Sequence, residues 1–381
     1  MTHTALPIPA ADALAASQLL TAYISTQINT AGGWLPFDRY MDLALYAPGL
    51  GYYTGGATKL GSAGDFITAP EMTPLYAQAL ATQVAQIMQA SAPQILEFGA
   101  GSGALARDLI AALQAQGVTL ERYCIVEPSP QLRARQYRTL AHVPIDLQWL
   151  DAPAPNFRGA VIANEVLDAM PVKLFVRTQD AVFERGVALS EDGAFEWHDE
   201  VASTEIHAAV AALENELGAL PTPYVSELPL AAHAWATSLA PWLAQGAALL
   251  IDYGFTRREF YHPQRASGTL MCHYRHRAHT DALWLPGLND ITAHVDFTSV
   301  AEHAQAAGLD VLGYTAQNHF LLNCGVLTHL AAHEHDPRQK QAVQRLLSEA
   351  EMGELFKVLA VGRGLDEPLI GFTQGDRSHR L

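Results

Sequence analysis

The chain has 381 residues, a formal net charge of −16 at pH 7 and an isoelectric point of about 5.4. This length suits one large α/β domain with insertions, or two domains. The acidic balance argues against nucleic acid or an anionic membrane surface as the main partner, and favours a cationic ligand or a basic protein segment.

The cysteines and the N-terminal segment bear on the compartment. Cys124, Cys272 and Cys324 have no paired spacing, which indicates a reducing environment without a disulfide framework. The first thirty residues include Asp12 and no lysine or arginine, so we interpret them as mature protein and not as a targeting signal. No apolar stretch has the length needed to span a bilayer. We therefore expect a cytoplasmic protein without membrane insertion.

Residues 1–92 are predicted to form an N-terminal cap. Residues 12–30 have helical periodicity, and an aromatic, glycine-rich stretch follows over residues 33–53. Thr73-Pro74 then predicts an N-cap with proline at the first helical position, for a helix that runs to about residue 89.

A polar cluster precedes that helix. Asp65, Thr68 and Glu71 are expected near the cofactor if the cap covers it, with Thr68 as a binding residue. The spacing of Thr68 and Glu71 is also that of a capping box, so a structural role is an equal alternative.

The segment Gln94–Gly103 carries the strongest signal in the chain. A short apolar strand ends in a loop with glycine at 99, 101 and 103, and a helix-forming segment follows over residues 104–115. Gly99, Gly101 and Gly103 allow positive φ and close approach of the backbone to a ligand, and the helix N-terminus offers free N–H groups. The loop therefore predicts a nucleotide-like cofactor.

The glycine pattern does not by itself distinguish S-adenosylmethionine (SAM) from NAD. Glu97 favours SAM, because a carboxylate suits a cationic sulfonium better than two phosphates. Glu127 ends the next strand, where it can accept both ribose hydroxyls of either cofactor. Asp151 follows the third strand and can accept the adenine amino group, although a plain turn residue is as good an interpretation.

The rest of the chain predicts a doubly wound α/β fold. Expected strands at 94–98, 123–127, 145–149, 160–165 and 247–252 alternate with helices at 104–115 and 129–138. Such alternation indicates a parallel sheet that binds its ligand at the carboxyl ends of the strands. We assign residues 93–381 to this core, with insertions near 172–230 and 255–298. The first insertion is expected to hold a β-meander and a helix near 204–217.

The C-terminal part is expected to complete the sheet. Ser299 and Glu302 have the spacing of a capping box that opens a helix. Strand-like segments follow at 311–314, 319–324 and 355–361, with a helix near 337–350.

Candidate chemistry lies in the segment Asn164–Pro171, at the carboxyl end of the fourth strand. Polar side chains there are costly to bury unless they bind something. Glu165 and Asp168 could hold a guanidinium through charge-assisted, bidentate hydrogen bonds, and Asn164 could orient the methyl donor. The alternative is that Asn164 caps the following turn and that Glu165 is solvated.

A basic segment over residues 257–279 has no clear role. His273, His276 and His279 recur at every third residue, but their spacing matches no zinc signature and the interleaved arginines would repel a dication. We expect no metal site, and interpret the segment as a partner or anion contact, or as a solvated loop.

Together these motifs resemble the MidA-like SAM-dependent methyltransferases, a family that includes the mitochondrial arginine methyltransferase assisting assembly of respiratory complex I. The resemblance covers nearly the whole chain. It depends on the segments Gly64–Glu71, Glu97–Gly103, Asn164–Pro171, Ile251–Gly254 and His294–Phe297. It implies a Rossmann-like methyltransferase fold, SAM as cofactor and, for the mitochondrial member, symmetric dimethylation of an arginine in a complex I subunit.

We therefore expect a SAM-dependent methyltransferase that acts on a protein arginine, with a complex I subunit among the candidate substrates. A small-molecule O- or N-methyltransferase and a SAM-binding assembly factor with little turnover are the alternatives. An NAD-dependent dehydrogenase remains a more remote one.

Overall fold

The computed structural model describes residues 6–55, 68–333 and 335–381. The chain divides into two compact units, each assembled from three separate segments. Unit 1 contains residues 1–66, 169–231 and 258–294, and unit 2 contains residues 67–168, 232–257 and 295–381. Asp65 lies outside the described residues.

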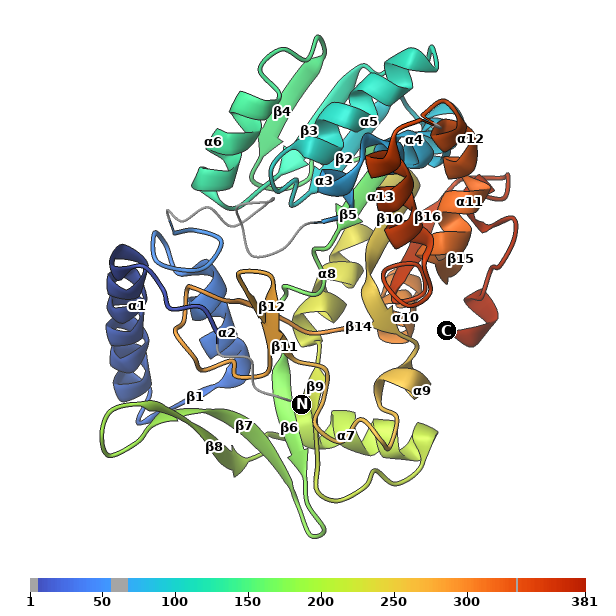
Figure 1. Ribbon diagram of the computed structural model, residues 1–381. Helices are drawn as coiled ribbons and strands as arrows, with labels where there is room; N and C mark the ends of the chain where they lie inside the picture. Colours follow the sequence, from blue (N-terminus) through green and yellow to red (C-terminus); the bar gives the residue numbers. More distant parts are fainter. Residues whose placement is uncertain (1–5, 56–67, 334) are drawn as a thin grey trace. The chain divides into compact units, whose positions relative to one another are not determined.

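Unit 2 contains an eight-stranded sheet in the order β15-β16-β10-β5-β2-β3-β4, with β14 beside β10 (Figure 1). Strands β2 to β5 and β10 run parallel, whereas β16 is antiparallel to both β10 and β15. The strands are β2 (Gln94–Phe98), β3 (Arg122–Val126), β4 (Asp146–Leu150), β5 (Phe157–Asn164), β10 (Leu243–Phe255), β14 (Val295–Asp296), β15 (Asp310–Ala316) and β16 (Phe356–Arg363). The predicted parallel sheet is confirmed, and the C-terminal strands β15 and β16 complete it as expected.

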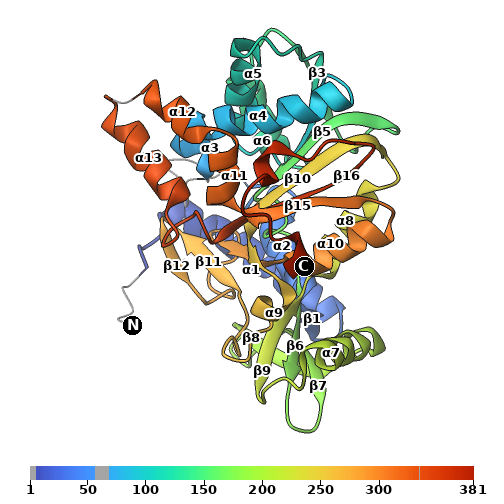
Figure 2. The same ribbon diagram turned by 90° about the vertical axis from the view of Figure 1, so that its right-hand side faces the viewer.

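Helices pack on both faces of this sheet because its strands are apolar on both sides. On one face, Ile95, Ile162 and Leu249 share a core with the apolar residues of α4 and α5. On the other face, Phe98 contacts Trp235 of α8, and Figure 2 shows α10 beside β15. The helices of this unit are α3 (Ala69–Met72), α4 (Pro74–Ala90), α5 (Ala104–Ala115), α6 (Pro130–Thr139), α10 (Phe297–Ala306), α11 (Gln317–Asn323), α12 (Val326–Ala331) and α13 (Pro337–Leu347), with the 3₁₀ turns η1 (Ile370–Phe372) and η2 (Ser378–Arg380). Helices α8 (Leu230–Leu239) and α9 (Arg257–Phe260) continue from one unit into the other along the chain.

Helix α4 belongs to the unit that contains the sheet. Thr73 caps it as predicted, since its Oγ1 accepts a hydrogen bond from the Leu75 N–H at 3.1 Å. Leu80 and Val84 of this helix are fully buried in the core around the sheet. Packing therefore puts the limit of the unit near residue 67, whereas the sequence places a domain boundary near residue 92.

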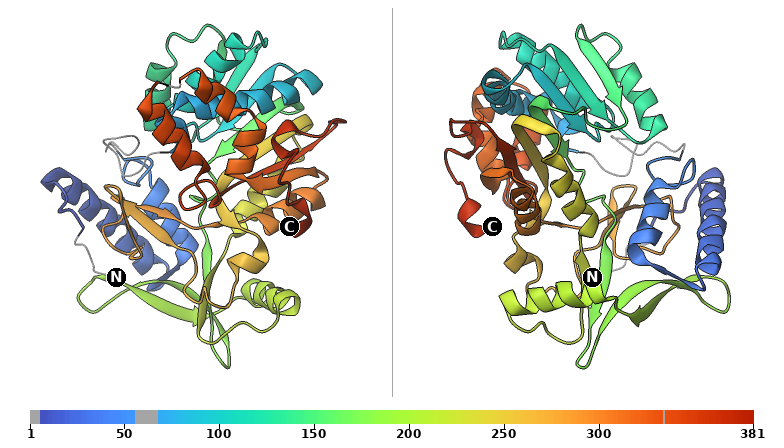
Figure 3. Two further views of the ribbon diagram at one scale, coloured as in Figure 1. Left: turned by 45° about the vertical axis from the view of Figure 1, so that its right-hand side comes forward. Right: turned by 180° about the vertical axis from the view of Figure 1, so that it is seen from behind.

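Unit 1 contains a five-stranded antiparallel sheet in the order β1-β7-β6-β9, with β8 on β7, and a three-stranded sheet in the order β12-β11-β13. The strands are β1 (Trp34–Pro36), β6 (Lys173–Arg177), β7 (Val182–Leu189), β8 (Phe195–Val201), β9 (Tyr224–Leu228), β11 (Met271–Tyr274), β12 (Arg277–His279) and β13 (Asp290–Thr292). Helices α1 (Ala11–Thr30) and α2 (Phe37–Tyr46) lie on the same side of the larger sheet, as the blue and green elements of Figure 3 show, and α7 (Thr204–Leu217) follows β8. A separate core that includes Leu20, Tyr40 and Val187 holds these elements together. The predicted meander is confirmed as β6, β7 and β8.

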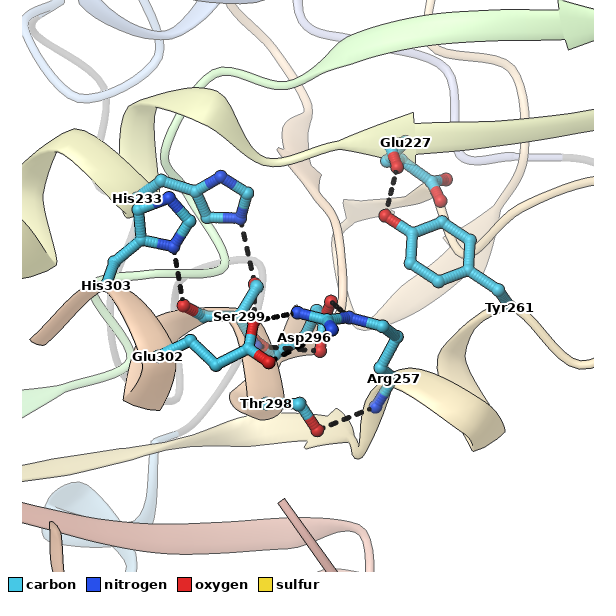
Figure 4. A network of polar contacts seen from close by, with 9 residues as sticks. All are labelled: Glu227, His233, Arg257, Tyr261, Asp296, Thr298, Ser299, Glu302 and His303. Atoms are coloured by element: carbon cyan, nitrogen blue, oxygen red, sulfur yellow. Dashed lines mark hydrogen bonds and ion pairs between the residues drawn. The ribbon is translucent and has the colours of Figure 1, made fainter. Parts of the chain in front are cut away.

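Two sequence-based expectations in the C-terminal part are wrong. Helix α10 begins at Phe297 and is capped by Asp296, whose Oδ1 accepts the Ser299 N–H at 3.2 Å, so Ser299 is not the N-cap (Figure 4). Segment 319–324, expected as a strand, lies mostly in α11. Its short apolar run fits either structure by pattern, and the helix buries both Phe320 and Leu321.

The capping box that was the alternative interpretation of Thr68 and Glu71 is not formed at the start of α3. Thr68 occupies the N-cap position, but its side chain makes no capping hydrogen bond. The Glu71 N–H instead donates to the Thr68 carbonyl oxygen at 3.0 Å. Among the helices of the described residues, none is both long and apolar enough to cross a membrane.

Candidate functional site

Three predicted motifs meet at the carboxyl edge of the sheet in unit 2. Phe98 at the end of β2 is in register with Val126 of β3 and Ala163 of β5. The Gly99 N–H donates to the Val126 carbonyl oxygen at 3.0 Å. A Cβ atom placed on Gly99 would lie 3.2 Å from Cγ2 of Val166, so the glycine loop lies directly beside the segment that follows β5.

The glycine loop has the backbone conformation that its sequence predicts. Gly99, Gly101 and Gly103 have φ angles of 60°, 52° and 81°, all in the left-handed region that favours glycine. Gln136 of α6 donates through Nε2 to the Gly101 carbonyl oxygen at 3.1 Å. The loop is thus fixed against α6 and passes directly into the N-terminus of α5, an arrangement suited to an anionic or polar ligand.

Glu127 lies at the end of β3 and is held by the chain's own donors. Its side chain is buried, Oε1 accepts the Ser129 N–H at 3.0 Å, and Oε2 accepts Gln136 Nε2 at 3.0 Å. Burial raises the pKa of this carboxyl group, and these hydrogen bonds oppose the rise. A carboxylate has about four acceptor sites, so Glu127 retains capacity for the ribose hydroxyls. That contact stays a prediction.

Glu97 lies inside the core beneath the glycine loop. It is 2% exposed, and the Tyr123 hydroxyl donates to its Oε2 at 2.8 Å. Burial raises the pKa of Glu97 to about 7. At neutral pH it is therefore partly protonated, which weakens the attraction for a sulfonium on which its predicted role depends. A contact of Glu97 with the cofactor stays a prediction.

Asp151 and Thr68 occupy more exposed positions. Asp151 is exposed, and Arg133 Nη2 lies 2.7 Å from its Oδ1. Arg133 also donates to the carbonyl oxygens of Glu127 and Leu150, so it ties the ends of β3 and β4 together. Thr68 is half-buried at the start of α3. Cofactor contacts of Asp151 and Thr68 stay predictions.

Asn164 orients the acidic segment after β5. Its Oδ1 accepts the Tyr76 hydroxyl at 2.7 Å, and its Nδ2 donates to Glu165 Oε1 at 3.1 Å. Glu165 has a φ of 52°, a left-handed conformation that is unfavourable for a non-glycine residue. The Glu165 N–H donates to the Ile251 carbonyl oxygen at 2.8 Å, which helps to fix this conformation. Backbone strain of this kind is concentrated at functional sites.

Asp252, in the carboxyl-terminal part of β10, organises the same segment. Its Oδ2 accepts the N–H groups of Leu167 and Asp168 at 3.0 and 3.1 Å. Asp252 is fully buried, and its pKa is raised well above the ordinary value by burial and then by the negative charges of Asp168 and Glu165. Three carboxyl groups so close together favour a cationic ligand, which would relieve their repulsion.

The sequence missed several residues that hold this site together. Asp252 carries the same signal as Glu165, since both are acids at the end of an apolar strand, but no role was assigned to it. Tyr76, Arg133 and Gln136 lie on helices, and no local pattern distinguishes them from other polar helix residues. Their contacts come from segments distant in the sequence, which only the fold brings together.

The basic histidine segment belongs to unit 1, whereas the residues of the sheet edge belong to unit 2. His273 lies on β11, His279 on β12 and His276 in the turn between them, all in unit 1. His279 Nε2 lies 2.9 Å from Asn289 Oδ1. Among the residues whose positions are described, no group of three or more His, Cys, Asp or Glu side chains is arranged to hold a metal ion.

Comparison with known proteins identifies the family. Residues 79–315 match the model of a family described as "Putative S-adenosyl-L-methionine-dependent methyltransferase". The chain belongs to this methyltransferase family. A crystal structure of a COG1565 superfamily member from Burkholderia thailandensis, bound to S-adenosyl-homocysteine, is 50% identical to this methyltransferase with a TM-score of 0.94. The similarity covers 99% of this chain and 100% of that one.

More distant relatives are mitochondrial proteins. The zebrafish protein named "Protein arginine methyltransferase NDUFAF7, mitochondrial" is 28% identical over 366 residues, which cover 87% of the methyltransferase and 84% of the relative. The human protein of the same name is 27% identical over 383 residues, covering 86% and 80%.

The residues at the sheet edge fit SAM, the cofactor of this family. The glycine loop provides close backbone approach at Gly99 and Gly101, and Glu127 provides a fixed acceptor at the end of β3. Expectations of a SAM-dependent methyltransferase with an α/β fold are therefore confirmed, and the NAD-dependent alternative is wrong.

Proposed function

We propose that this methyltransferase transfers the methyl group of SAM to an arginine side chain of a protein substrate. The observation that carries the proposal is the convergence of Glu165, Asp168 and Asp252 beside the glycine loop. The names of the mitochondrial relatives support the same acceptor. Following the family resemblance, a respiratory complex I subunit is the first substrate to test, and we propose that the reaction occurs in the cytoplasm.

In this proposal the acidic segment binds and orients the acceptor. Glu165 and Asp168 accept charge-assisted hydrogen bonds from the guanidinium N–H groups and fix the plane of that group. Asn164 holds Glu165 Oε1 through its amide, while Tyr76 fixes the amide. Positioning of this kind supplies much of the acceleration available to a displacement reaction.

When bound, SAM would supply an electrophilic methyl group, and its sulfonium would become the neutral thioether of S-adenosyl-homocysteine. The attacking guanidinium nitrogen loses a proton, and a carboxylate of the acidic segment accepts it. Asp252 keeps the Leu167 and Asp168 N–H groups in place throughout, because both donate to its Oδ2.

The variant Glu165→Gln tests the proposal, because it preserves the shape of the side chain and removes its charge. We expect SAM affinity, measured by calorimetry, to stay within about twofold of wild type. Transfer of labelled methyl groups into protein from an extract of a strain lacking the enzyme should fall at least about tenfold, a loss of ~1.4 kcal/mol of transition-state stabilisation. The exposed acid Asp180 offers a matched control, and Asp180→Asn should leave both quantities unchanged.

Two results would contradict the assignment in different ways. Loss of SAM binding in Glu165→Gln would put Glu165 in the donor site. Unchanged binding together with unchanged transfer would make Glu165 structural, and the arginine acceptor would lose its physical basis.

A further inference from the structure

Strand β8 forms an outer edge of the larger sheet in unit 1. Within the described parts of the chain it pairs with β7 alone, in one continuous antiparallel register from Phe195 to Val201. The Ser190 N–H donates to the Ala194 carbonyl oxygen, and the Ala202 N–H donates to the Val182 carbonyl oxygen. In an antiparallel ladder every second residue bonds to the neighbouring strand. These two bonds therefore decide which alternate residues of β8 bond to β7. The even-numbered residues of β8 bond to β7, and the N–H and C=O groups of residues 195, 197, 199 and 201 point outward.

This edge lacks most of the usual protection against strand addition. Proteins guard exposed edges with charged side chains, especially lysine, and with proline, bulges or very short strands. The formal charges of residues 190–201 are all negative, so they repel an acidic segment but not a basic one. Residues 190–201 contain no lysine, arginine or proline, and the seven-residue pairing with β7 contains no bulge. Two large apolar side chains are nevertheless exposed on the edge, Val201 at 79% and Trp197 at 37%.

The edge is strongly acidic. Its exposed acids are Glu191, Asp192, Glu196, Asp199 and Glu200. Arg185 of β7 pairs with Asp199 through two contacts of 2.7 and 2.9 Å, and its guanidinium lies 5.9 Å from the ring centre of Trp197. Glu196 and Glu200 are on the opposite face of the strand from this pair, because side chains alternate along a strand.

We propose that the outer edge of β8 binds an extended, basic polypeptide segment, which adds to the sheet as a further strand. Backbone hydrogen bonds to the outward groups of β8 would supply affinity, and the acidic side chains would select arginine or lysine at alternate positions. This interaction surface is independent of the acceptor that the methyltransferase site takes.

A second copy of the same chain suits this edge poorly, because it would bring the acidic residues of one edge against the same acidic residues of the other. In the antiparallel register centred on His198, each Glu196 would also lie directly opposite a Glu200. Like charges in directly opposed positions destabilise strand pairing. A basic segment places opposite charges at the same positions, so charge complementarity favours a partner of different sequence.

The test uses three labelled ten-residue peptides, measured by fluorescence anisotropy with the full-length protein. One alternates arginine with threonine, one alternates glutamate with threonine, and one is the arginine peptide with N-methylated backbone amides that cannot pair as a strand. We expect binding of the first peptide only. Backbone hydrogen exchange should show slower exchange at Trp197, Asp199 and Val201 on binding, because their N–H groups point outward.

Two matched sets of variants complete the test. Glu196→Lys with Glu200→Lys should weaken binding of the arginine peptide by about tenfold, because two attractions become repulsions. The same reversal at two exposed acids of unit 2, Glu349→Lys with Glu367→Lys, should leave it unchanged.

Val201→Pro removes one outward N–H without breaking a bond to β7, and should weaken binding by about threefold, while Val201→Ala should not. Three results would overturn the proposal. The N-methylated peptide could bind as tightly as the unmodified arginine peptide, or both charge-reversal variants could bind the arginine peptide equally. The third is that peptide binding does not slow exchange at the outward amides. Protection of those amides that depends on protein concentration without peptide would also overturn it, in favour of self-association.

Discussion

Backbone conformation distinguishes the residues of the site from others of the same type. Gly101 has a left-handed backbone, and so does Glu165, a residue that adopts this conformation at a cost of about 1–2 kcal/mol. Both lie in loops that leave the carboxyl edge of the same sheet. At Gly101 the conformation requires glycine, whereas at Glu165 neighbouring hydrogen bonds maintain it.

Gly101→Val should abolish SAM binding and leave the protein folded. A β-branched residue opposes the φ of 52°, and its side chain would fill space that bound SAM needs beside the loop. Gly117 gives a matched control, because it also has a positive φ, of 70°, and a Cβ there would meet nothing within 4 Å. Calorimetry with SAM should show no binding for Gly101→Val and wild-type affinity for Gly117→Val. Wild-type affinity in Gly101→Val would exclude the loop from the SAM site.

Glu97 should make the stability of the protein depend on pH. Burial raises its pKa from 4.5 to about 7, so between these values the folded state binds more protons than the unfolded state. The contribution of Glu97 to stability is therefore fully present below about pH 4.5 and is lost as the pH rises through 7. The loss is on the order of 3 kcal/mol.

The variant Glu97→Gln isolates this effect, since glutamine stays neutral and can still accept the Tyr123 hydroxyl. Urea unfolding at pH 5 and pH 8 should show a smaller decrease in the free energy of unfolding for Glu97→Gln than for wild type. Glu121 is exposed, so Glu121→Gln should keep the wild-type decrease. Identical decreases in wild type and Glu97→Gln would show that Glu97 does not titrate in this range.

At the scale of residues, the sequence predicts types and positions better than contacts. Acids at strand ends are visible in the pattern, and Glu127 and Glu165 lie where parallel strands must end. The sequence could not show that the Tyr123 hydroxyl donates a hydrogen bond to Glu97 or that Arg133 binds Asp151, because each pair joins separate segments.

Among the elements, α10 shows how a local pattern can mislead. Ser299 and Glu302 have capping-box spacing, yet the helix begins earlier because Asp296 caps it. Ser299 Oγ lies 2.8 Å from His233 Nε2 instead, within the polar network that joins α8 to α10 (Figure 4). Arg257 lies 3.7 Å from Asp296 and also pairs with Glu302.

Asp296→Ala should destabilise the protein by about 2 kcal/mol, because it removes the helix cap and leaves a buried N–H without its acceptor. Asp296→Asn keeps the acceptor and should cost less. Glu302 is half-exposed and does not cap the helix, so Glu302→Gln should cost less than about 0.5 kcal/mol. Urea unfolding measures all three variants, and an equal loss in Asp296→Ala and Glu302→Gln would restore the capping-box interpretation.

The parallel strands were predicted well, because buried strands form continuous apolar runs bounded by turn residues. Helix α11 is not predictable in this way, because its apolar run of Phe320, Leu321 and Leu322 is too short to show helical or strand periodicity. Whether such a run is helical depends on what it packs against, and that information is not local.

At the scale of the whole molecule, the fold class follows from the alternation of strands and helices, but the assembly of the units does not. Unit 1 combines the N-terminal segment with both long insertions of the sheet domain. Residues such as Leu20, Val187 and Ile291 come from all three segments and share one core. Their contacts join segments that are far apart in the chain, so the sequence shows where the insertions begin and not that they fold together.

The most direct test of the central claim is mass spectrometry of proteins methylated by the purified enzyme. An extract from a strain lacking the enzyme is incubated with enzyme and isotopically labelled SAM, and labelled peptides are sequenced. The proposal predicts label on arginine of one or a few proteins with wild-type enzyme, and at least about tenfold less with Glu165→Gln. Label on another residue type or only on small molecules, or equal labelling by both enzymes, would contradict it.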